Sequence, residues 1–168
     1  MIYFIADTHF GHQAIMGYES RPFSSVEEMD RQLIKNWNEV VTGEDTVFVL
    51  GDFSAYDKEK TTRICQQLVG KKILVKGNHD TESEAYYREC GFSSVYDYPI
   101  ILENFWILSH EPMYLNGNMP YANIYGHVHG SEQYVDYSAH SFCACVERIQ
   151  YRPIAWDEVK RKMAEIKA

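Results

Sequence analysis

Short apolar runs alternate with longer segments along the first half of the chain. The runs at 2–6, 47–50 and 73–76 are too brief for helices and predict buried strands. Three longer segments between and after these runs predict helices: 26–41, 58–69 and 82–90. In the first of these segments, apolar residues recur every three or four positions. This alternating order predicts a parallel sheet with right-handed crossovers.

The second half of the chain changes to closely spaced strands. Residues 100–102 and 105–108 predict a hairpin around Glu103 and Asn104. Further strands are expected at 124–125, 141–147 and 151–154, followed by a closing helix at 156–166. Residues 111–122 have no periodicity and predict a surface loop. The strand-rich half therefore predicts a second sheet that faces the first.

The length of 168 residues predicts one domain over residues 1–168, with no cap domain. The first residues enter a strand-like run directly, without a basic or long apolar segment. No stretch approaches the roughly 20 apolar residues of a membrane-spanning helix. We therefore expect a cytoplasmic protein that does not contact a membrane, and no particular oligomeric state is predicted.

The formal net charge of −8 bears on the choice of partner. A strongly acidic surface without a Lys/Arg stripe repels a nucleic-acid backbone, so stable nucleic-acid binding is not expected. Four cysteines are present, and none has the C-x-x-C spacing of a zinc ribbon. We expect small buried side chains in a reduced compartment, with a redox pair or extra metal ligands at Cys143 and Cys145 as the alternative.

Five of the strand-like runs end in clusters of His, Asp and Asn. The side chains concerned are Asp7 and His9, Asp52, Asn78 with His79 and Asp80, His110, and His127 with His129. In open α/β sheets, chemistry is found outside the carboxyl ends of the strands. The pattern therefore predicts one metal site assembled from five loops.

Residue type and spacing suit a pair of divalent cations. The seven candidate ligands are Asp7, His9, Asp52, Asn78, His110, His127 and His129. The carboxylate of Asp52 can bridge two cations through its two oxygens. The seven ligands carry only two formal negative charges, so two cations would leave a net positive site suited to a phosphate ester. Mixed imidazole and carboxylate ligands favour Mn, Fe or Zn over Mg or Ca alone.

The order of the motifs resembles a known family. D-x-H, G-D, G-N-H-D, a lone His and G-H-x-H follow one another between residues 7 and 129, as in the calcineurin-like metallophosphoesterases. The opening stretch 7–12, with Arg21-Pro22-Phe23 and Asn36-Trp37-Asn38, is similar to a small bacterial and phage branch of phosphoesterases. The resemblance implies a four-layer α/β/β/α sandwich of two facing mixed sheets.

The resemblance also implies a role for each site residue. One ion would be held by Asp7, His9, Asp52 and His129, and the other by Asp52, Asn78, His110 and His127. His79 would face the substrate, and Asp80 would orient it by accepting its other ring N–H. Manganese is the preferred cation, with Fe, Zn, Ni and Mg as alternatives.

The function implied is hydrolysis of phosphate esters by attack of a metal-bridging hydroxide on phosphorus. Phosphodiesters are favoured, with small nucleotides among the substrates. Phosphomonoesters, nuclease action and a non-catalytic interaction scaffold are the alternatives. The x-x-D-R-G continuation of the phosphoprotein phosphatases is absent after Asp52, so that specificity is not expected. His12 and Arg21 are candidates for the missing phosphate-facing groups, an ordinary solvated loop arginine being the alternative for Arg21.

Overall fold

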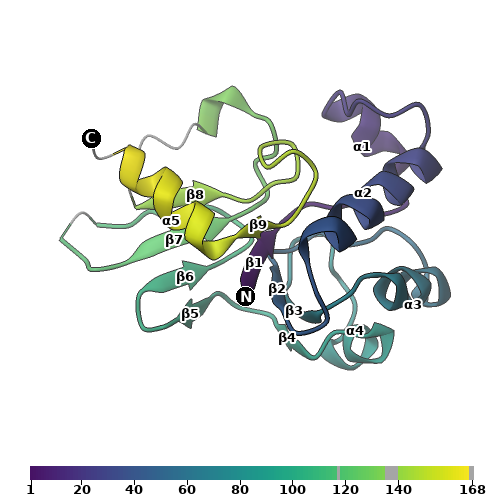
Figure 1. Ribbon diagram of the computed structural model, residues 1–168, viewed down its shortest axis with the longest axis horizontal. Helices are drawn as coiled ribbons and strands as arrows, with labels where there is room; N and C mark the ends of the chain where they lie inside the picture. Colours follow the sequence, from purple (N-terminus) through teal and green to yellow (C-terminus); the bar gives the residue numbers. More distant parts are fainter. Residues whose placement is uncertain (117, 135–139, 167–168) are drawn as a thin grey trace.

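The computed structural model describes residues 1–116, 118–134 and 140–166, which form two sheets with helices on their outer sides (Figure 1). The first sheet has five strands in the order β4 (Ser94–Tyr96), β3 (Lys71–Val75), β2 (Thr46–Val49), β1 (Ile2–Ile5) and β9 (Ile154–Ala155). Strands β1 to β4 are parallel, whereas β9 runs antiparallel to β1. The first sheet is therefore mixed.

The second sheet has four strands in the order β5 (Ile100–Leu102), β6 (Trp106–Leu108), β7 (Ala122–Tyr125) and β8 (Ser141–Cys143). β6, β7 and β8 are parallel, and β5 forms the expected antiparallel hairpin with β6. The two sheets meet just beyond β1 and β8. There, the Ala6 N–H donates to the Ala144 carbonyl at 2.8 Å and the Val146 N–H donates to the Ala6 carbonyl at 3.1 Å. We call this pair of hydrogen bonds the seam.

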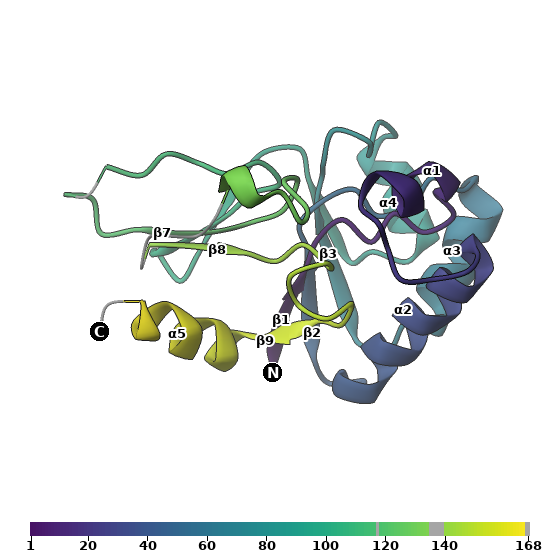
Figure 2. The same ribbon diagram turned by 90° about the horizontal axis from the view of Figure 1, so that it is seen from above.

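The helical elements are α1 (Gln13–Tyr18), α2 (Val26–Val40), α3 (Lys58–Gln67), α4 (Glu84–Cys90), α5 (Trp156–Glu165) and the short 3₁₀ helix η1 (Glu132–Tyr134). The longer helices cover the outer sides of the two sheets, as the second view shows (Figure 2). Helices α2 to α4 lie against the first sheet, and α5 lies on the side of β8 and β9. The predicted class, a sandwich of two mixed sheets between helical layers, is confirmed.

Local sequence explains why α2 forms where it does. The Ser25 hydroxyl accepts a hydrogen bond from the Glu28 N–H, which caps the first turn. Met29, Leu33 and Trp37 recur on one face and are buried against the core. This stripe holds α2 on the sheet, because burial of an amphipathic face supplies most of a helix's stability.

The structure differs from the sequence prediction at four elements. Helix α1 and strand β4 were not predicted; α1 has six residues, one buried residue and no side-chain cap, so its local signal is weak. The strand expected at 141–147 ends at Cys143, because the chain then forms the seam with Ala6. The strand expected at 151–154 is reduced to β9, because the chain turns at Gln150 and Tyr151, both with positive φ. In the described ranges, no helix combines the length and the apolar character needed to cross a bilayer.

Candidate metal centre

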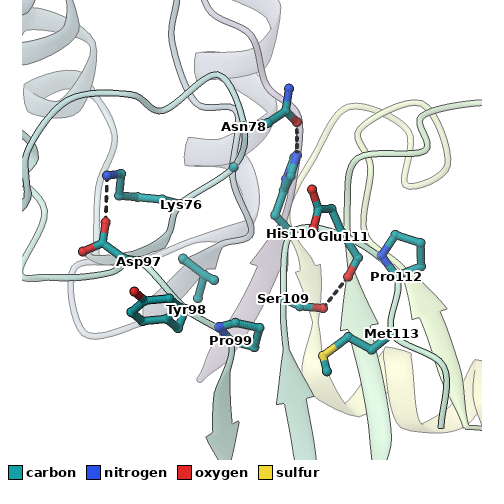
Figure 3. A pocket seen from close by; sticks show the side chains of 12 residues that line it. Lys76, Asn78, Asp97, Tyr98, Pro99, Ser109, His110, Glu111, Pro112 and Met113 are labelled. Atoms are coloured by element: carbon teal, nitrogen blue, oxygen red, sulfur yellow. Dashed lines mark hydrogen bonds and ion pairs between the residues drawn. The ribbon is translucent and has the colours of Figure 1, made fainter.

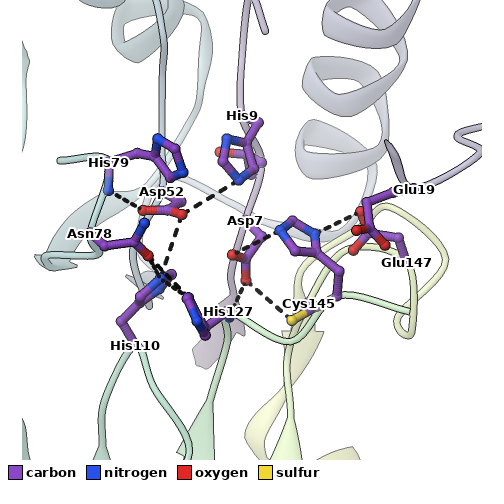
Figure 4. Close-up of polar contacts among 12 residues, drawn as sticks. Asp7, His9, Glu19, Asp52, Asn78, His79, His110, His127, Cys145 and Glu147 are labelled. Carbon is purple, nitrogen blue, oxygen red and sulfur yellow. Dashed lines mark hydrogen bonds and ion pairs between the residues drawn. The ribbon is translucent and has the colours of Figure 1, made fainter. Parts of the chain in front are cut away.

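The carboxyl ends of five strands from both sheets bring the seven candidate ligands together. Figure 4 labels Asp7, His9, Asp52, Asn78, His110 and His127. The first sheet supplies Asp7 and His9 after β1, Asp52 after β2 and Asn78 after β3. The second sheet supplies His110 after β6, and His127 and His129 after β7. The site therefore lies at the junction of the two sheets, beside the seam.

The first group of facing ligand atoms comprises Asp7, His9 and His129 with Asp52. His129 Nε2 lies 3.6 Å from Asp7 Oδ1, and His9 Nε2 lies 3.5 Å from Asp52 Oδ2. Single ligand atoms of Asp7, His9 and His129 all lie within 4.8 Å of one another. Asp7, His9 and Asp52 are almost fully buried, whereas His129 is half-buried.

The second group comprises Asn78, His110 and His127, again with Asp52. Asn78 Oδ1 lies 3.0 Å from both His110 Nε2 and His127 Nδ1, and these two nitrogens lie 3.1 Å apart. His110 Nε2 lies 3.5 Å from Asp52 Oδ2. Asn78 and His127 are exposed, so this end of the site opens to solvent.

Asp52 links the two groups through one oxygen. Its Oδ2 faces both His9 and His110, whereas its Oδ1 accepts a hydrogen bond from the His79 N–H at 2.9 Å. The sequence analysis expected both oxygens to be shared between cations. The His79 amide occupies one of them, which leaves Oδ2 as the common point.

The donor set fits a pair of cations. Asp7 Oδ1 and His9 Nε2 are buried without a hydrogen-bond partner, a costly arrangement that a bound cation would relieve. Two donors held about 2.1 Å from one ion lie roughly 3.0–3.4 Å apart. The separations of 3.0–3.6 Å in the two groups are close to that range. The spacing of these atoms is therefore close to the spacing that shared coordination of a cation requires.

The other oxygen of Asp7 is fixed by two donors. Its Oδ2 accepts from the His127 N–H at 2.8 Å and from the Cys145 thiol at 3.1 Å. Burial raises the pKa of the Cys145 thiol well above its usual range, so the thiol stays protonated and can donate. Because both hydrogen bonds go to Oδ2, Asp7 Oδ1 remains free to face the site. Cys145 thus supports the site through its hydrogen bond to Asp7, and its sulfur lies 3.2 Å from that of Cys143.

The backbone at the ligands adopts an uncommon conformation. Positive φ angles occur at five of the seven ligands: Asp7 (59°), His9 (49°), Asp52 (53°), His127 (71°) and His129 (48°). Asp and His tolerate the left-handed region better than most residues, but non-glycine residues hold it only where the surroundings impose it. The Asp7 N–H donates to the Gly51 carbonyl and the His9 N–H to the Asp52 carbonyl, both at 3.0 Å. Backbone hydrogen bonds between the loops therefore hold the ligands in this geometry.

Two glycines allow these loops to pack together. A Cβ at Gly77 would collide with the Asp52 carboxylate and the His110 ring. Gly51 has a φ of +89°, and a Cβ there would meet the backbone of Gly77 at 2.7 Å. The glycine in each of the motifs G-D and G-N-H-D is therefore required by close approach of the loops.

Glu147, which the sequence analysis did not select, supports His129 from behind. Its Oε1 lies 3.1 Å from His129 Nδ1, the ring nitrogen that faces away from Asp7. Burial alone would lower the pKa of His129. The hydrogen bond with Glu147 and the charges of Asp7 and Glu147 outweigh burial, so the pKa of His129 is raised above its ordinary value. A carboxylate in this position fixes the ring and makes Nε2 a better ligand. Glu147 follows β8 as the candidate ligands follow their strands, so its place at a strand end was the available signal.

Arg21 lies behind the site, which contradicts its prediction as a phosphate-facing group. Its guanidinium is buried, lies 2.7 Å from Glu147 Oε1, and donates to the Asp7 carbonyl at 2.7 Å and the Thr8 carbonyl at 3.0 Å. The alternative of a solvated loop arginine is wrong as well. Arg21 holds Glu147 and the loop that carries Asp7.

Replacement of Glu147 by glutamine is expected to weaken cation binding by about 10- to 100-fold, because the charge that supports His129 is lost. Titration of the purified protein with Mn²⁺, followed by calorimetry, measures the change. Glu132→Gln, an exposed substitution in η1, is the matched control and should bind as the wild type does. Equal affinities in Glu147→Gln and the wild type would contradict the supporting role.

Asp80 has a different position from the one predicted. Its buried carboxylate accepts hydrogen bonds from the backbone N–H groups of Asp52 (2.7 Å), Phe53 (3.1 Å) and Gly77 (2.9 Å). Both oxygens are thus used to tie the loop after β2 to the loop after β3. Asp80 fixes the two loops rather than orienting the His79 ring.

His79 and His12 lie at the mouth of the site. The ring centres of His79 and His9 are 5.3 Å apart, and those of His12 and His9 are 5.2 Å apart. His79 is exposed, and His12 is partly buried. Both rings therefore lie close to the ligand His9, on the side of the site that solvent reaches.

Cation binding is expected to release more protons at about pH 6 than at about pH 8. Burial raises the pKa of Asp7 to about 6, and the pKa of His129 is also raised, so both hold protons near pH 6. Burial lowers the pKa of His9 to about 2, so His9 is already neutral. A cation binds only deprotonated ligands, so affinity falls as the pH drops through this range. Calorimetry in two buffers of different ionisation enthalpy counts the protons, and equal counts at both pH values would contradict this result.

Two mixed sheets with the site at their junction define the metallophosphoesterase fold. A family model described as calcineurin-like phosphoesterase matches residues 1–159. The chain therefore belongs to the calcineurin-like phosphoesterase family, whose activity is hydrolysis of phosphoesters.

Several proteins are similar to this chain in sequence or in fold. The uncharacterized protein MJ1445 of Methanocaldococcus jannaschii is 34% identical over 162 residues, which cover 93% of this chain and 87% of that protein. The Gene 66 protein of Mycobacterium phage L5 is 36% identical over 81 residues, covering 46% and 39%. The structure of AQ665 from Aquifex aeolicus, a protein of unknown function, has a TM-score of 0.75 at 30% identity over 96% of this chain and 98% of its own. Pseudomonas putida nuclease MPE has a TM-score of 0.53 at 22% identity, over 76% and 61%.

Proposed function

We propose that this protein hydrolyses phosphate esters with two divalent cations, and that phosphodiesters are preferred. One observation carries the proposal: Asp52 Oδ2 lies 3.5 Å from both His9 Nε2 and His110 Nε2, at the junction of two donor groups. Paired cations at such a site lower the pKa of a water and offset the charge that develops on the phosphoryl oxygens. Manganese, the cation we expect, suits the carboxylate and amide oxygens of the ligand set, whereas iron, zinc and nickel suit its imidazoles.

The ligands divide between the two cations as follows. Asp7, His9, Asp52 and His129 hold one cation, and Asp52, Asn78, His110 and His127 hold the other. The first group is the more buried, and the second opens to solvent through Asn78 and His127. The substrate therefore approaches from the side of Asn78 and His127.

His79 donates the proton that the leaving oxygen takes up. Its ring is exposed at the mouth of the site, and a positioned imidazole can act as a general acid. The His79 N–H also holds Asp52 Oδ1. His12, close to the same mouth, contacts the phosphoryl group of the substrate. In this proposal, Asp80 acts only through the loops that it ties together.

The diester preference is supported by the space on either side of the site. A cavity of about 390 Å³ lies beside Asn78 and His110, and another of about 320 Å³ lies beside His79. A phosphodiester has two substituents on phosphorus, so it can fill both cavities, whereas a monoester fills one. The net charge of −8 favours small esters over long nucleic acids.

We further propose one domain over residues 1–168 without a cap, and a cytoplasmic location.

Metal analysis and a hydrolysis screen test the proposal together. The purified protein is loaded with Mn²⁺, Fe²⁺, Zn²⁺, Ni²⁺ or Mg²⁺ and assayed on p-nitrophenyl mono- and diesters and on a short oligonucleotide. Two bound cations and faster turnover of the diester are expected. Preference for the monoester or the oligonucleotide would overturn the diester assignment. Tight cation binding without turnover of any ester would favour the non-catalytic scaffold instead.

A further inference from the structure

The larger cavity is a separate feature beside the metal centre. It lies between the loops 75–78, 97–99 and 109–113, and Asn78 and His110 form its boundary with the site (Figure 3). Its volume of about 390 Å³ falls within the range of small-molecule sites. His79, the residue after Asn78, lines the other cavity. The two neighbouring residues therefore line two separate cavities.

One wall of this cavity is fixed before any ligand binds. The side chain of Asn123, fully buried in β7, accepts from the Met113 N–H at 2.9 Å and donates to Ser109 Oγ at 2.8 Å. Ser109 Oγ in turn donates to the Glu111 carbonyl at 2.7 Å. This network holds the segment 109–113 in one conformation, so little ordering is needed on binding.

The side chains at the cavity combine apolar faces with charged groups. Tyr98 is 79% exposed although it lines the cavity, and Met113 is 41% exposed. An exposed aromatic ring beside a polar site offers a surface for stacking. Lys76 pairs with Asp97 at 2.7 Å, and exposed Glu111 adds a further carboxylate. A planar ring with polar edges matches this mixture, because its faces stack while its edges meet donors and acceptors.

We propose that this cavity binds the nucleobase of a nucleoside phosphodiester, with Tyr98 as its stacking surface. The inference rests on the proposed phosphoesterase function. The base belongs to the substituent that stays on phosphorus, because His79, the proposed proton donor to the leaving oxygen, lines the opposite cavity. Water then adds to phosphorus, the bond to the leaving oxygen breaks, and that oxygen takes a proton. The products are a nucleoside monophosphate and an alcohol.

A pair of diesters with the same leaving group tests the subsite. Methyl p-nitrophenyl phosphate and thymidine 5′-(p-nitrophenyl phosphate) both release p-nitrophenol, and only the second carries a base. The wild type is expected to prefer the second by about tenfold or more in kcat/KM, through a lower KM, as stacking on one aromatic side chain provides. In Tyr98→Ala this preference should fall to near one, whereas Tyr98→Phe should retain it. Tyr18→Ala, at a residue that is 78% exposed in α1, is the matched control and should also retain it.

Binding measurements separate failure of the subsite from failure of the proposed function. Thymidine 5′-monophosphate is titrated into the Mn²⁺-loaded protein by calorimetry, with ribose 5-phosphate as the ligand without a base. Tighter binding of the first, lost in Tyr98→Ala, is expected even if no ester is hydrolysed. If both diesters are hydrolysed equally by the wild type and both ligands bind alike, the subsite is overturned and the phosphoesterase function stands. If no ester is hydrolysed with any cation, the phosphoesterase function is overturned, and the binding result alone decides the subsite.

Discussion

Asp52→Asn is expected to lower phosphodiester turnover by at least about 10³-fold, a loss of several kcal/mol of transition-state stabilisation. Asp52 Oδ2 is the oxygen that faces both His9 and His110, so one substitution weakens both cation positions. Asparagine keeps the size of the side chain but removes the negative charge. Both the cation content of the purified protein and kcat on a chromogenic diester should therefore fall.

The comparison needs a carboxylate that lies away from the site. Asp157, whose side chain is 86% exposed at the start of α5, provides it, and Asp157→Asn should keep full cation content and activity. Thermal unfolding followed by circular dichroism checks that Asp52→Asn still folds. A folded Asp52→Asn variant with wild-type turnover would remove Asp52 from the mechanism.

His79→Ala is expected to lower kcat by about 10²-fold or more while both cations stay bound. The substitution removes the ring at the mouth of the site but keeps the backbone N–H that donates to Asp52 Oδ1. The cation site should therefore keep its geometry, and the loss should be confined to proton transfer. Metal analysis and steady-state kinetics on the same sample measure the two effects separately.

The leaving group sharpens this test. p-Nitrophenolate leaves readily as an anion, whereas an alkoxide must be protonated as it leaves. The loss of kcat in His79→Ala should therefore be larger for a diester with an alkyl leaving group. His12→Ala is the matched substitution of a neighbouring imidazole, and its effect should be independent of the leaving group. Alkyl-diester turnover within twofold of the wild type would exclude His79 as the proton donor.

The sequence predicted the elements that depend on local signals. Apolar runs end at Asp7, Asp52 and His110, and the structure brings these residues and the other expected ligands to the junction of the two sheets. The order of strands and helices in the first half of the chain also follows from local patterns, apart from α1 and β4. Metal ligands and helix caps can be recognised in the sequence because each lies in a short motif of a few neighbouring residues.

The residues that support the site depend on contacts distant in sequence. Glu147 and Arg21 meet across 126 positions, and Cys145 meets Asp7 across 138. Their contacts arise because the chain after β8 joins Ala6 at the seam, a pairing that no periodicity encodes. Asp80 is a second case: the sequence analysis assigned it to the adjacent His79, whereas its oxygens bind backbone amides of a loop nearly thirty residues earlier. Adjacency in the sequence therefore did not predict the partners of the Asp80 carboxylate.

Because the ligands come from both sheets, cation binding should stabilise the contact between the two sheets. Four ligands belong to the first sheet and three to the second, so each bound cation would fasten one half of the molecule to the other. Whatever free energy the cations gain on binding then opposes separation of the halves. Chelation should consequently loosen this joint before either half melts, and hydrogen exchange should rise first at Ala6, Ala144 and Val146.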